Sequence, residues 1–392
     1  MQNYNDYNYN APRRQNNAIL ILLIILISLV LAVAVMGIIY MLRTPVVAPP
    51  ADGTTDPTVT TDPVATDEPG VTDEPAVTTE APVTEPTPDD RGITFIGTPV
   101  KSTGIFSGNL ILVNKDHGYN FEVNAKKDSN VGSLYDFWKP WPKYSYKLTG
   151  TKVKMHTSTA ELMSVMFDGF LDETELNDYL ITSGYRDYQL QQETLDEMIA
   201  DYGSESAALR YCALPGYSEH HTGLAFDVYV FTDEQKTYKL GEEKMPGVYN
   251  WIYDNCAKYG FIHRYQAGKE SITGFAEESW HFRYVGLPHA QIMEERDFCF
   301  EEYINFLKDY TYDNYLVAEG ADGKTYAIYY EEVELETVVI EEVKDANGNV
   351  ITPASVTEQL PDTATLHLPI GDFPYEVSGN NVDGFIVTIT LK

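Results

Sequence analysis

The chain is organised around the stretch S-E-H-H-T-G-L-A-F-D-V-Y-V-F, residues 218–231. From position 224 its apolar residues occupy every second position, which is typical of a strand with one face in a core; they are Leu224, Phe226, Val228 and Val230. This alternation predicts that Asp227 points away from the core, beside the small side chain of Ala225. His220 lies in the preceding turn, where Gly223 allows the backbone to bend and bring the imidazole towards Asp227.

A histidine and an aspartate presented in this way could supply two ligands of a catalytic zinc ion. Such an ion takes three protein ligands and leaves one position for water. A second stretch, E-S-W-H at residues 278–281, offers the missing groups at the start of another alternating segment. His281 is the candidate third ligand, and Glu278 is the candidate general base.

The two stretches together carry a resemblance to a known family. The pattern S-x-H-x-x-G-x-A-x-D, followed by E-x-W-H, resembles the VanY-type D-alanyl-D-alanine carboxypeptidases, zinc enzymes that trim peptidoglycan stem peptides. The resemblance covers roughly residues 109–306. It implies His220, Asp227 and His281 as zinc ligands and Glu278 as the general base.

The resemblance also implies roles for two residues outside this set. Arg186 follows S-G-Y at residues 183–185 and is implied as the group that stabilises the developing oxyanion, and Ser218 is implied as a substrate contact. One departure is visible, because the family often has Gln where this chain has His221. The spacing to Asp227 favours His220 over His221 as the ligand.

The surrounding sequence predicts an α+β domain, with a small antiparallel sheet flanked by helices, as the resemblance also implies. Residues 110–114 are predicted to form a strand, and Asp187 is predicted to cap a helix that ends at Gly203. Gln191, within that helix, could contact substrate, but it is interpreted as an exposed amide. From Tyr312 the pattern becomes all-β, with hairpin turns expected at residues 320–323 and 347–348.

Composition divides the chain into five parts. We expect a polar cytoplasmic tail at residues 1–17, a transmembrane anchor at 18–42 and a disordered linker rich in Thr, Pro, Asp and Glu at 43–91. A zinc carboxypeptidase domain at 92–309 and a small β-rich module at 310–392 follow. We find no catalytic constellation in the β-rich module.

The apolar run at residues 18–42 carries no charged residue and is long enough to cross a bilayer as a helix, which takes about 20 residues. A cleaved signal peptide is the alternative, but its apolar core is usually only about 7–15 residues long. Arg13 and Arg14 precede the run, whereas Arg43 alone follows it. We therefore expect the N-terminus in the cytoplasm and the catalytic domain outside the cell.

The net charge of −32 and the pI of about 4.4 make nucleic acid an unfavourable partner, because both surfaces are anionic. Such a surface also repels anionic wall polymers unless local patches or divalent cations intervene. The three cysteines, Cys212, Cys256 and Cys299, form no C-x-x-C pattern and are interpreted as buried or unpaired thiols.

The sequence thus predicts a membrane-anchored zinc carboxypeptidase that removes the terminal D-alanine from peptidoglycan stem peptides. Within the family, an L,D-carboxypeptidase that acts on tetrapeptide stems is an alternative. A non-catalytic wall-binding protein is another, although a structural zinc would not need the unliganded base Glu278. A membrane-anchored protease for ordinary L-peptides is a further alternative.

Overall fold

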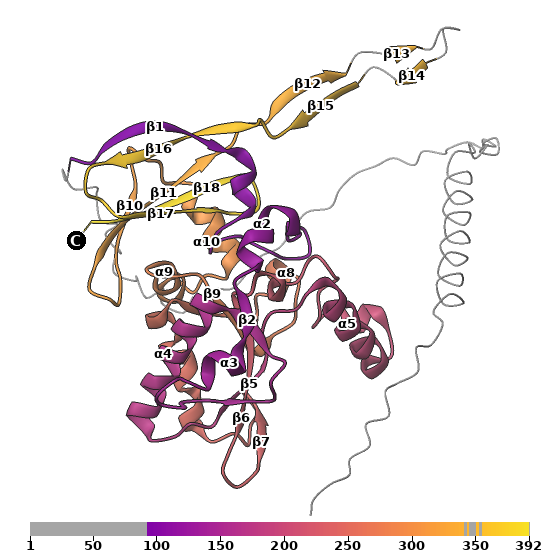
Figure 1. Cartoon of the computed structure of the whole chain (residues 1–392), viewed down its shortest axis with the longest axis vertical. Coiled ribbons are helices and arrows are strands. Elements are labelled where there is room, and N and C mark those ends of the chain that lie inside the picture. Colours follow the sequence, from indigo (N-terminus) through magenta and orange to yellow (C-terminus); the bar gives the residue numbers. More distant parts are fainter. Residues whose placement is uncertain (1–91, 341–342, 345–349, 353–354, 392) are drawn as a thin grey trace, which may run out of the picture. The chain divides into compact units, whose positions relative to one another are not determined.

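The structure, a computed structural model, describes residues 92–340, 343–344, 350–352 and 355–391 (Figure 1). The predicted tail, anchor and linker lie outside these residues, as does the predicted turn at 347–348. Within the described ranges, no helix is both long enough and apolar enough to cross a membrane.

A six-stranded sheet, formed by strands between residues 147 and 284, is the centre of the domain that bears the predicted site. Its strand order is β3-β5-β6-β9-β8, with β7 paired to β6. The strands are β3 (Lys147–Leu148), β5 (Tyr179–Ser183), β6 (Ala225–Phe231), β7 (Thr237–Lys239), β8 (Phe261–Tyr265) and β9 (Glu278–Tyr284). All neighbours are antiparallel except β3 and β5. The predicted mixture of helices and a mainly antiparallel sheet is therefore confirmed.

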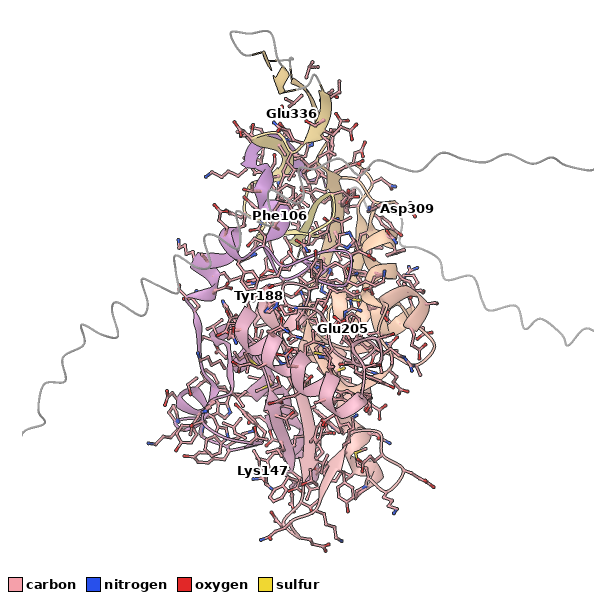
Figure 2. The ribbon with its side chains drawn as sticks, turned by 90° about the vertical axis from the view of Figure 1, so that its right-hand side faces the viewer. Phe106, Lys147, Tyr188, Glu205, Asp309 and Glu336 are labelled. Carbon is pink, nitrogen blue, oxygen red and sulfur yellow. The ribbon has the colours of Figure 1, made fainter. Side chains whose placement is uncertain are left out.

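Helices and short strands surround this sheet. They are α2 (Phe121–Asp128), β2 (Val131–Ser133), α3 (Leu134–Trp138), β4 (Lys154–His156), α4 (Thr157–Thr174), α5 (Tyr188–Tyr202), α6 (Glu205–Ala208), η2 (Glu219–Thr222), η3 (Gly247–Asn250), α7 (Trp251–Asn255), η4 (Cys256–Tyr259), α8 (Glu270–Thr273), α9 (His289–Glu295) and α10 (Phe300–Leu307). Figure 2 shows α5 and α6 side by side, marked by Tyr188 and Glu205.

Strand β6 has one face in the main core, as its alternation predicts. Phe226, Val228 and Val230 belong to that core, together with apolar residues of α4. Asp227 lies on the opposite face, which lines a cavity rather than the core. The hydrophobic period of the strand therefore orients the carboxylate.

The predicted ends of helix α5 are confirmed. An Asp187 carboxylate oxygen accepts a hydrogen bond from the Leu190 N–H at 2.8 Å, which satisfies a free donor of the first turn. Gly203 ends the helix with a φ of 76°, a left-handed conformation that glycine adopts without strain. The helix thus starts at Tyr188, two residues after Arg186.

The C-terminal module is built from strands, as predicted. A four-stranded sheet has the order β10-β11-β18-β17, and separate pairs are formed by β1 with β16, β12 with β15 and β13 with β14. The bounds are β1 (Thr94–Lys101), β10 (Leu316–Glu319), β11 (Thr325–Glu332), β12 (Glu336–Ile340), β13 (Val343–Lys344), β14 (Val350–Thr352), β15 (Ser355–Gln359), β16 (Thr363–Ile370), β17 (Tyr375–Gly379) and β18 (Gly384–Thr390). The predicted hairpin turn at 320–323 joins β10 to β11.

Strand β1 differs from the predicted division of the chain. It lies in the range assigned to the first domain, 92–309, yet it pairs along its whole length with β16 of the C-terminal module. The short helix η1 (Ser102–Phe106) follows it and packs beside β17 and β18. The chain therefore enters through the C-terminal module before it forms the site-bearing domain.

The predicted strand at residues 110–114 is wrong. These residues form no strand, although their apolar side chains are buried. The Leu112 N–H instead donates to the Asn380 carbonyl oxygen at 3.0 Å. The side-chain amide of Asn381 donates to the Leu112 carbonyl oxygen at 2.8 Å. Single hydrogen bonds to a distant loop thus replace the hydrogen-bond ladder of a sheet, because the segment is buried between α10 and the C-terminal sheet.

Candidate metal centre

Three buried side chains meet on the cavity-facing side of the sheet. They are His220 from η2, Asp227 from β6 and His281 from β9, and their potential ligand atoms all lie within 4.8 Å of one another. One Asp227 oxygen, Oδ1, lies 3.0 Å from His281 Nδ1, and the other, Oδ2, lies 3.3 Å from His220 Nε2. The structure thus brings together the three residues that sequence analysis proposed as ligands.

The local sequence explains why these side chains meet. Asp227 and His281 are directly opposed in the antiparallel pair β6 and β9, so both project from the same face of the sheet. Gly223 ends the η2 turn with a φ of 68°, and the Ser218 hydroxyl accepts a hydrogen bond from the His220 N–H at 3.3 Å. The turn therefore holds His220 beside the first residues of the strand.

Hydrogen bonds to the outer nitrogens orient both imidazoles. His220 Nδ1 donates to the Gly184 carbonyl oxygen at 2.6 Å, which leaves Nε2 facing Asp227. His281 Nε2 donates to Glu219 at 3.3 Å, which leaves Nδ1 facing Asp227. Outer partners of this kind fix the ring orientation of histidines that bind metals. Two imidazole nitrogens and one carboxylate oxygen therefore converge as a donor set that suits a divalent ion such as zinc.

The two imidazoles differ in their affinity for protons. Burial lowers the pKa of His220 to about 4, so this ring is neutral near pH 7. Burial also lowers the pKa of His281, but the hydrogen bonds that the ring donates to Asp227 and Glu219 raise it more, to about 9. In the absence of metal, His281 therefore carries a proton that a divalent ion would displace.

His221 lies outside the cluster. Its Nδ1 donates to the Arg186 carbonyl oxygen at 2.7 Å, and its Nε2 accepts from the Gly216 N–H at 2.9 Å. Both ring nitrogens of His221 are thus hydrogen-bonded to backbone groups, one at Arg186 and one at Gly216. Of the adjacent histidines, His220 is the one that faces Asp227, as the spacing predicts.

Glu278 lies next to the three side chains without joining them. It is the first residue of β9, is 5% exposed, and has Oε2 3.9 Å from His281 Nδ1. Burial raises the pKa of Glu278 to about 8. A buried carboxyl group with a raised pKa can hold a proton or release it near neutral pH, which suits a general base.

Arg186 contacts the cluster through Asp227. Its Nη2 donates to Asp227 Oδ2 at 2.7 Å, its Nη1 to Gln191 at 3.1 Å and its Nε to the Ser183 hydroxyl at 3.0 Å. The interpretation of Gln191 as an exposed amide is wrong, because this side chain is fully buried and also donates to the Ala213 carbonyl oxygen at 2.8 Å. Helix α5 thus presents Gln191 on the face that is turned towards the site.

Glu219 is an important residue that sequence reasoning missed. One of its oxygens, Oε1, accepts from Arg264 at 2.8 Å and from Arg283 at 2.9 Å, and the other accepts from His281. Burial opposes ionisation, but Arg264 and Arg283 hold the pKa of Glu219 well below its usual range. Both arginines are fully buried, and Arg264 also forms a two-bond pair with Glu301. The only sequence signal was that Glu219 precedes His220, since its partners lie on other strands.

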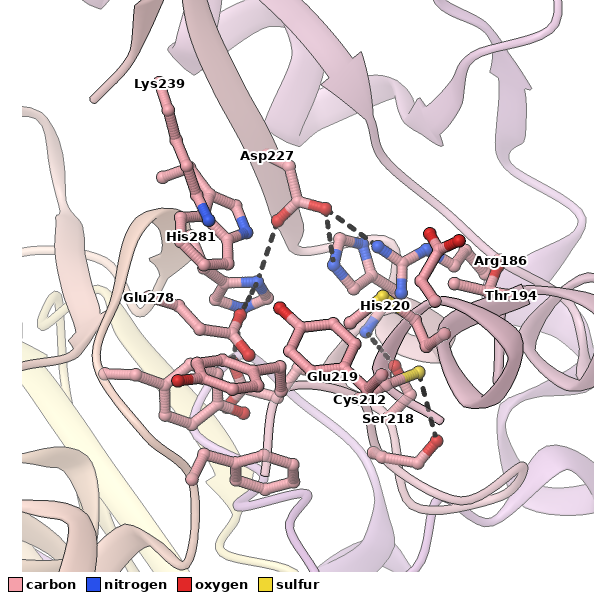
Figure 3. A pocket seen from close by; sticks show the side chains of 18 of the residues that line it. Arg186, Thr194, Cys212, Ser218, Glu219, His220, Asp227, Lys239, Glu278 and His281 are labelled. Atoms are coloured by element: carbon pink, nitrogen blue, oxygen red, sulfur yellow. Dashed lines mark hydrogen bonds and ion pairs between the residues drawn. The ribbon is translucent and has the colours of Figure 1, made fainter. Parts of the chain in front are cut away.

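A cavity of about 310 Å³ opens onto the cluster (Figure 3). The proposed ligands, Glu278, Arg186 and the predicted substrate contact Ser218 all line it. Aromatic side chains, among them Tyr229, Tyr265 and Trp280, supply much of the remaining wall. A small peptide with a polar backbone could thus be bound between aromatic faces and placed against the three buried side chains.

The fold and this cluster are suited to a hydrolase with one divalent metal ion. Comparison with known proteins identifies the family. A family model described as "VanY: D-alanyl-D-alanine carboxypeptidase" matches residues 133–287. A D-alanyl-D-alanine carboxypeptidase of Enterococcus faecium is 33% identical over 286 residues, which cover 73% of this chain and 76% of the relative. The chain therefore belongs to the VanY D-alanyl-D-alanine carboxypeptidase family.

Two further relatives agree with this assignment. The bifunctional D-Ala-D-Ala dipeptidase and carboxypeptidase VanXYC of Enterococcus gallinarum is 35% identical over 130 residues, covering 33% of this chain and 68% of that protein. The crystal structure of the D,D-dipeptidase VanXYg, bound to a D-Ala-D-Ala phosphinate analogue, matches with a TM-score of 0.57 and 29% identity. This match covers 76% of the present chain and 99% of VanXYg.

The buried charges around Glu219 lead to a prediction about stability. Glu219→Gln removes the negative charge that faces two fully buried guanidinium groups, and breaking a buried pair in this way costs about 3–5 kcal/mol. Urea unfolding of the two proteins measures the difference. The matched control, Glu234→Gln, removes one partner of a solvent-exposed pair with Lys236 and should leave the unfolding midpoint unchanged. Equal midpoints for Glu219→Gln and wild type would contradict this interpretation of the buried network.

Proposed function

We propose that this protein is a zinc-dependent D,D-carboxypeptidase that removes the terminal D-alanine from peptidoglycan stem peptides. One observation carries the proposal: His220, Asp227 and His281 converge as a buried donor set, with the unliganded carboxyl of Glu278 beside them. Family membership supports the reaction class, because the relative from Enterococcus faecium is a D-alanyl-D-alanine carboxypeptidase.

The donor set is the part of the proposal that specifies the metal. His220 Nε2, His281 Nδ1 and an Asp227 oxygen would hold the ion. Three protein ligands leave one position open, which is the arrangement of catalytic rather than structural zinc. When bound, zinc lowers the pKa of a coordinated water towards 7 and polarises a carbonyl group.

Glu278 is proposed to move the proton in the reaction. Its carboxylate takes a proton from the attacking water and then delivers that proton to the departing amine of D-alanine. Burial suits both steps, since it raises the pKa of Glu278 to about 8 and so reduces the free-energy difference between its two protonation states near neutral pH. Because it protonates the departing amine, the Glu278 carboxyl group has to lie on the side of the cavity where that amine leaves.

Arg186 is proposed to stabilise the oxygen of the scissile carbonyl. A guanidinium group has five N–H donors, and those that contact Ser183, Gln191 and Asp227 fix its plane. The remaining donors are free to face a developing negative charge, and such preorganised donors lower the barrier without reorganisation. Ser218, on the cavity wall, is proposed as a contact for the peptide backbone.

A stem-peptide assay tests the function and the role of Glu278 together. The zinc-loaded protein should release D-alanine from a pentapeptide stem, and Glu278→Gln should lower this rate by about 10²–10⁴-fold while the bound zinc remains. Released D-alanine and metal content are measured in parallel. Glu277→Gln is the matched control, because its side chain is the exposed neighbour and should retain full activity.

The same assay separates the alternatives. Release of D-alanine from a tetrapeptide stem, and not from the pentapeptide, would replace the proposal with an L,D-carboxypeptidase. A zinc-loaded protein that hydrolyses neither stem but sediments with cell walls would favour a wall-binding protein. Wild-type turnover by Glu278→Gln would remove this residue from the mechanism.

We also propose that residues 18–42 anchor the protein in the membrane, with the catalytic domain outside. The uncharged apolar run and the arginines before it support this orientation. The full chain should stay with membranes after an alkaline carbonate wash, and protease added to intact cells should remove the catalytic domain. A chain shortened to begin at Thr44 should be soluble. Release of the native protein, cleaved after the apolar run, would instead show a signal peptide.

A further inference from the structure

Lys239 is a cation on the wall of the site cavity to which sequence analysis gave no role. It ends β7 and stands directly opposite Tyr229 of β6. Opposed residues of an antiparallel pair project from the same face, and Tyr229 shares a face with Asp227 two residues earlier. The sheet register thus directs Lys239 into the cavity that contains the proposed ligands, where it forms part of the wall.

Lys239 differs from the other cations near the site because its donors are uncommitted. Arg264 and Arg283 are fully buried against Glu219, and Arg186 is paired with Asp227. The Lys239 ammonium lies 3.3 Å from the centre of the Trp280 ring, and it forms no ion pair with any residue that the structure describes. The indole face therefore positions a charge that remains available to a ligand.

Lys239 also lies on a particular side of the centre. In Figure 3 it lies on the side of Asp227 where His281 and Glu278 are found, whereas Arg186 lies on the other side. The ring that it contacts, Trp280, is two residues after Glu278 on β9, and both side chains line the cavity. The cavity thus has Arg186 at one end and Lys239 near Glu278 at the other.

We propose that Lys239 binds the terminal carboxylate of the stem peptide and so restricts cleavage to the last residue. This inference rests on the proposed function, in which Glu278 protonates the departing amine. In an α-amino acid the carboxylate is one carbon away from the carbon that bears the amine, so a cation for it must lie near Glu278. Lys239 is the cavity-lining residue that meets this requirement.

The charges of the cavity favour such a cation. Asp227, Glu278 and Glu219 all line it, and the whole chain carries a net charge of −32. Asp227 and Glu219 are paired with arginines, so Lys239 is a lining cation with which no carboxylate of the described residues forms an ion pair, and a substrate carboxylate can pair with it. An amide at the same position carries no charge and gains little from Lys239. Discrimination between a free carboxylate and an amide is therefore the expected signature of this residue.

Binding in the Glu278→Gln background tests the proposal without turnover. The zinc-loaded full chain is titrated calorimetrically with diacetyl-L-Lys-D-Ala-D-Ala, as the free acid and as the C-terminal amide. We expect the acid to bind about 10–100-fold more tightly, as for a hydrogen bond between charged groups. Adding Lys239→Met should remove this preference while the aliphatic contact with Trp280 is kept. Lys239→Arg should retain most of it.

Lys236→Met is the matched control, because Lys236 is an exposed lysine three residues earlier in the same hairpin. It should keep the wild-type preference. Equal binding of acid and amide by the Glu278→Gln protein, or an unchanged preference after Lys239→Met, would overturn the proposal. Cleavage of the pentapeptide by the wild type is a separate result: its failure would remove the proposed function, whereas the binding comparison would still decide the role of Lys239.

Discussion

The site depends on one cross-strand register, in which Asp227 of β6 stands opposite His281 of β9. A slip of one residue would turn Asp227 into the core and Phe226 or Val228 into the cavity, because successive side chains of a strand point to opposite faces. The apolar residues Phe226, Val228 and Val230 prevent this slip, since they are buried among aromatic and aliphatic partners. The hydrophobic core thus fixes the geometry of the polar centre.

Around this register the protein buries several charged side chains, most of them in one paired network. Glu219 connects His281 to Arg264 and Arg283. Glu301, on α10, also pairs with Arg264. Arg283 also donates to the Asn109 and Ile111 carbonyl oxygens, both at 3.0 Å. This network therefore links the outer side of a proposed metal ligand to the segment that returns from the C-terminal module. The position and the protonation state of His281 therefore depend on side chains that are packed well away from the cavity.

The sequence was most informative where chemistry depends on local patterns. The alternation around Asp227, the φ-positive Gly223 and the capped helix after Arg186 could each be predicted from a few neighbouring residues. Contacts between distant segments could not. Nothing near Glu219 indicates that two arginines from β8 and β9 will surround it, and nothing near Gln191 indicates that a loop at Ala213 covers it. The pairing of β1 with β16 joins segments more than 250 residues apart, and periodicity carries no information about such partners.

Two imidazoles and one carboxylate are proposed to hold a single catalytic ion. Zinc titration of the metal-free full chain, followed by determination of bound metal, is the decisive measurement. The account predicts one tightly bound zinc per chain, loss of that zinc in His281→Ala and Asp227→Asn, and retention in His117→Ala, whose imidazole lies elsewhere and contacts Asn114. Unchanged zinc binding after removal of His281 or Asp227 would contradict it.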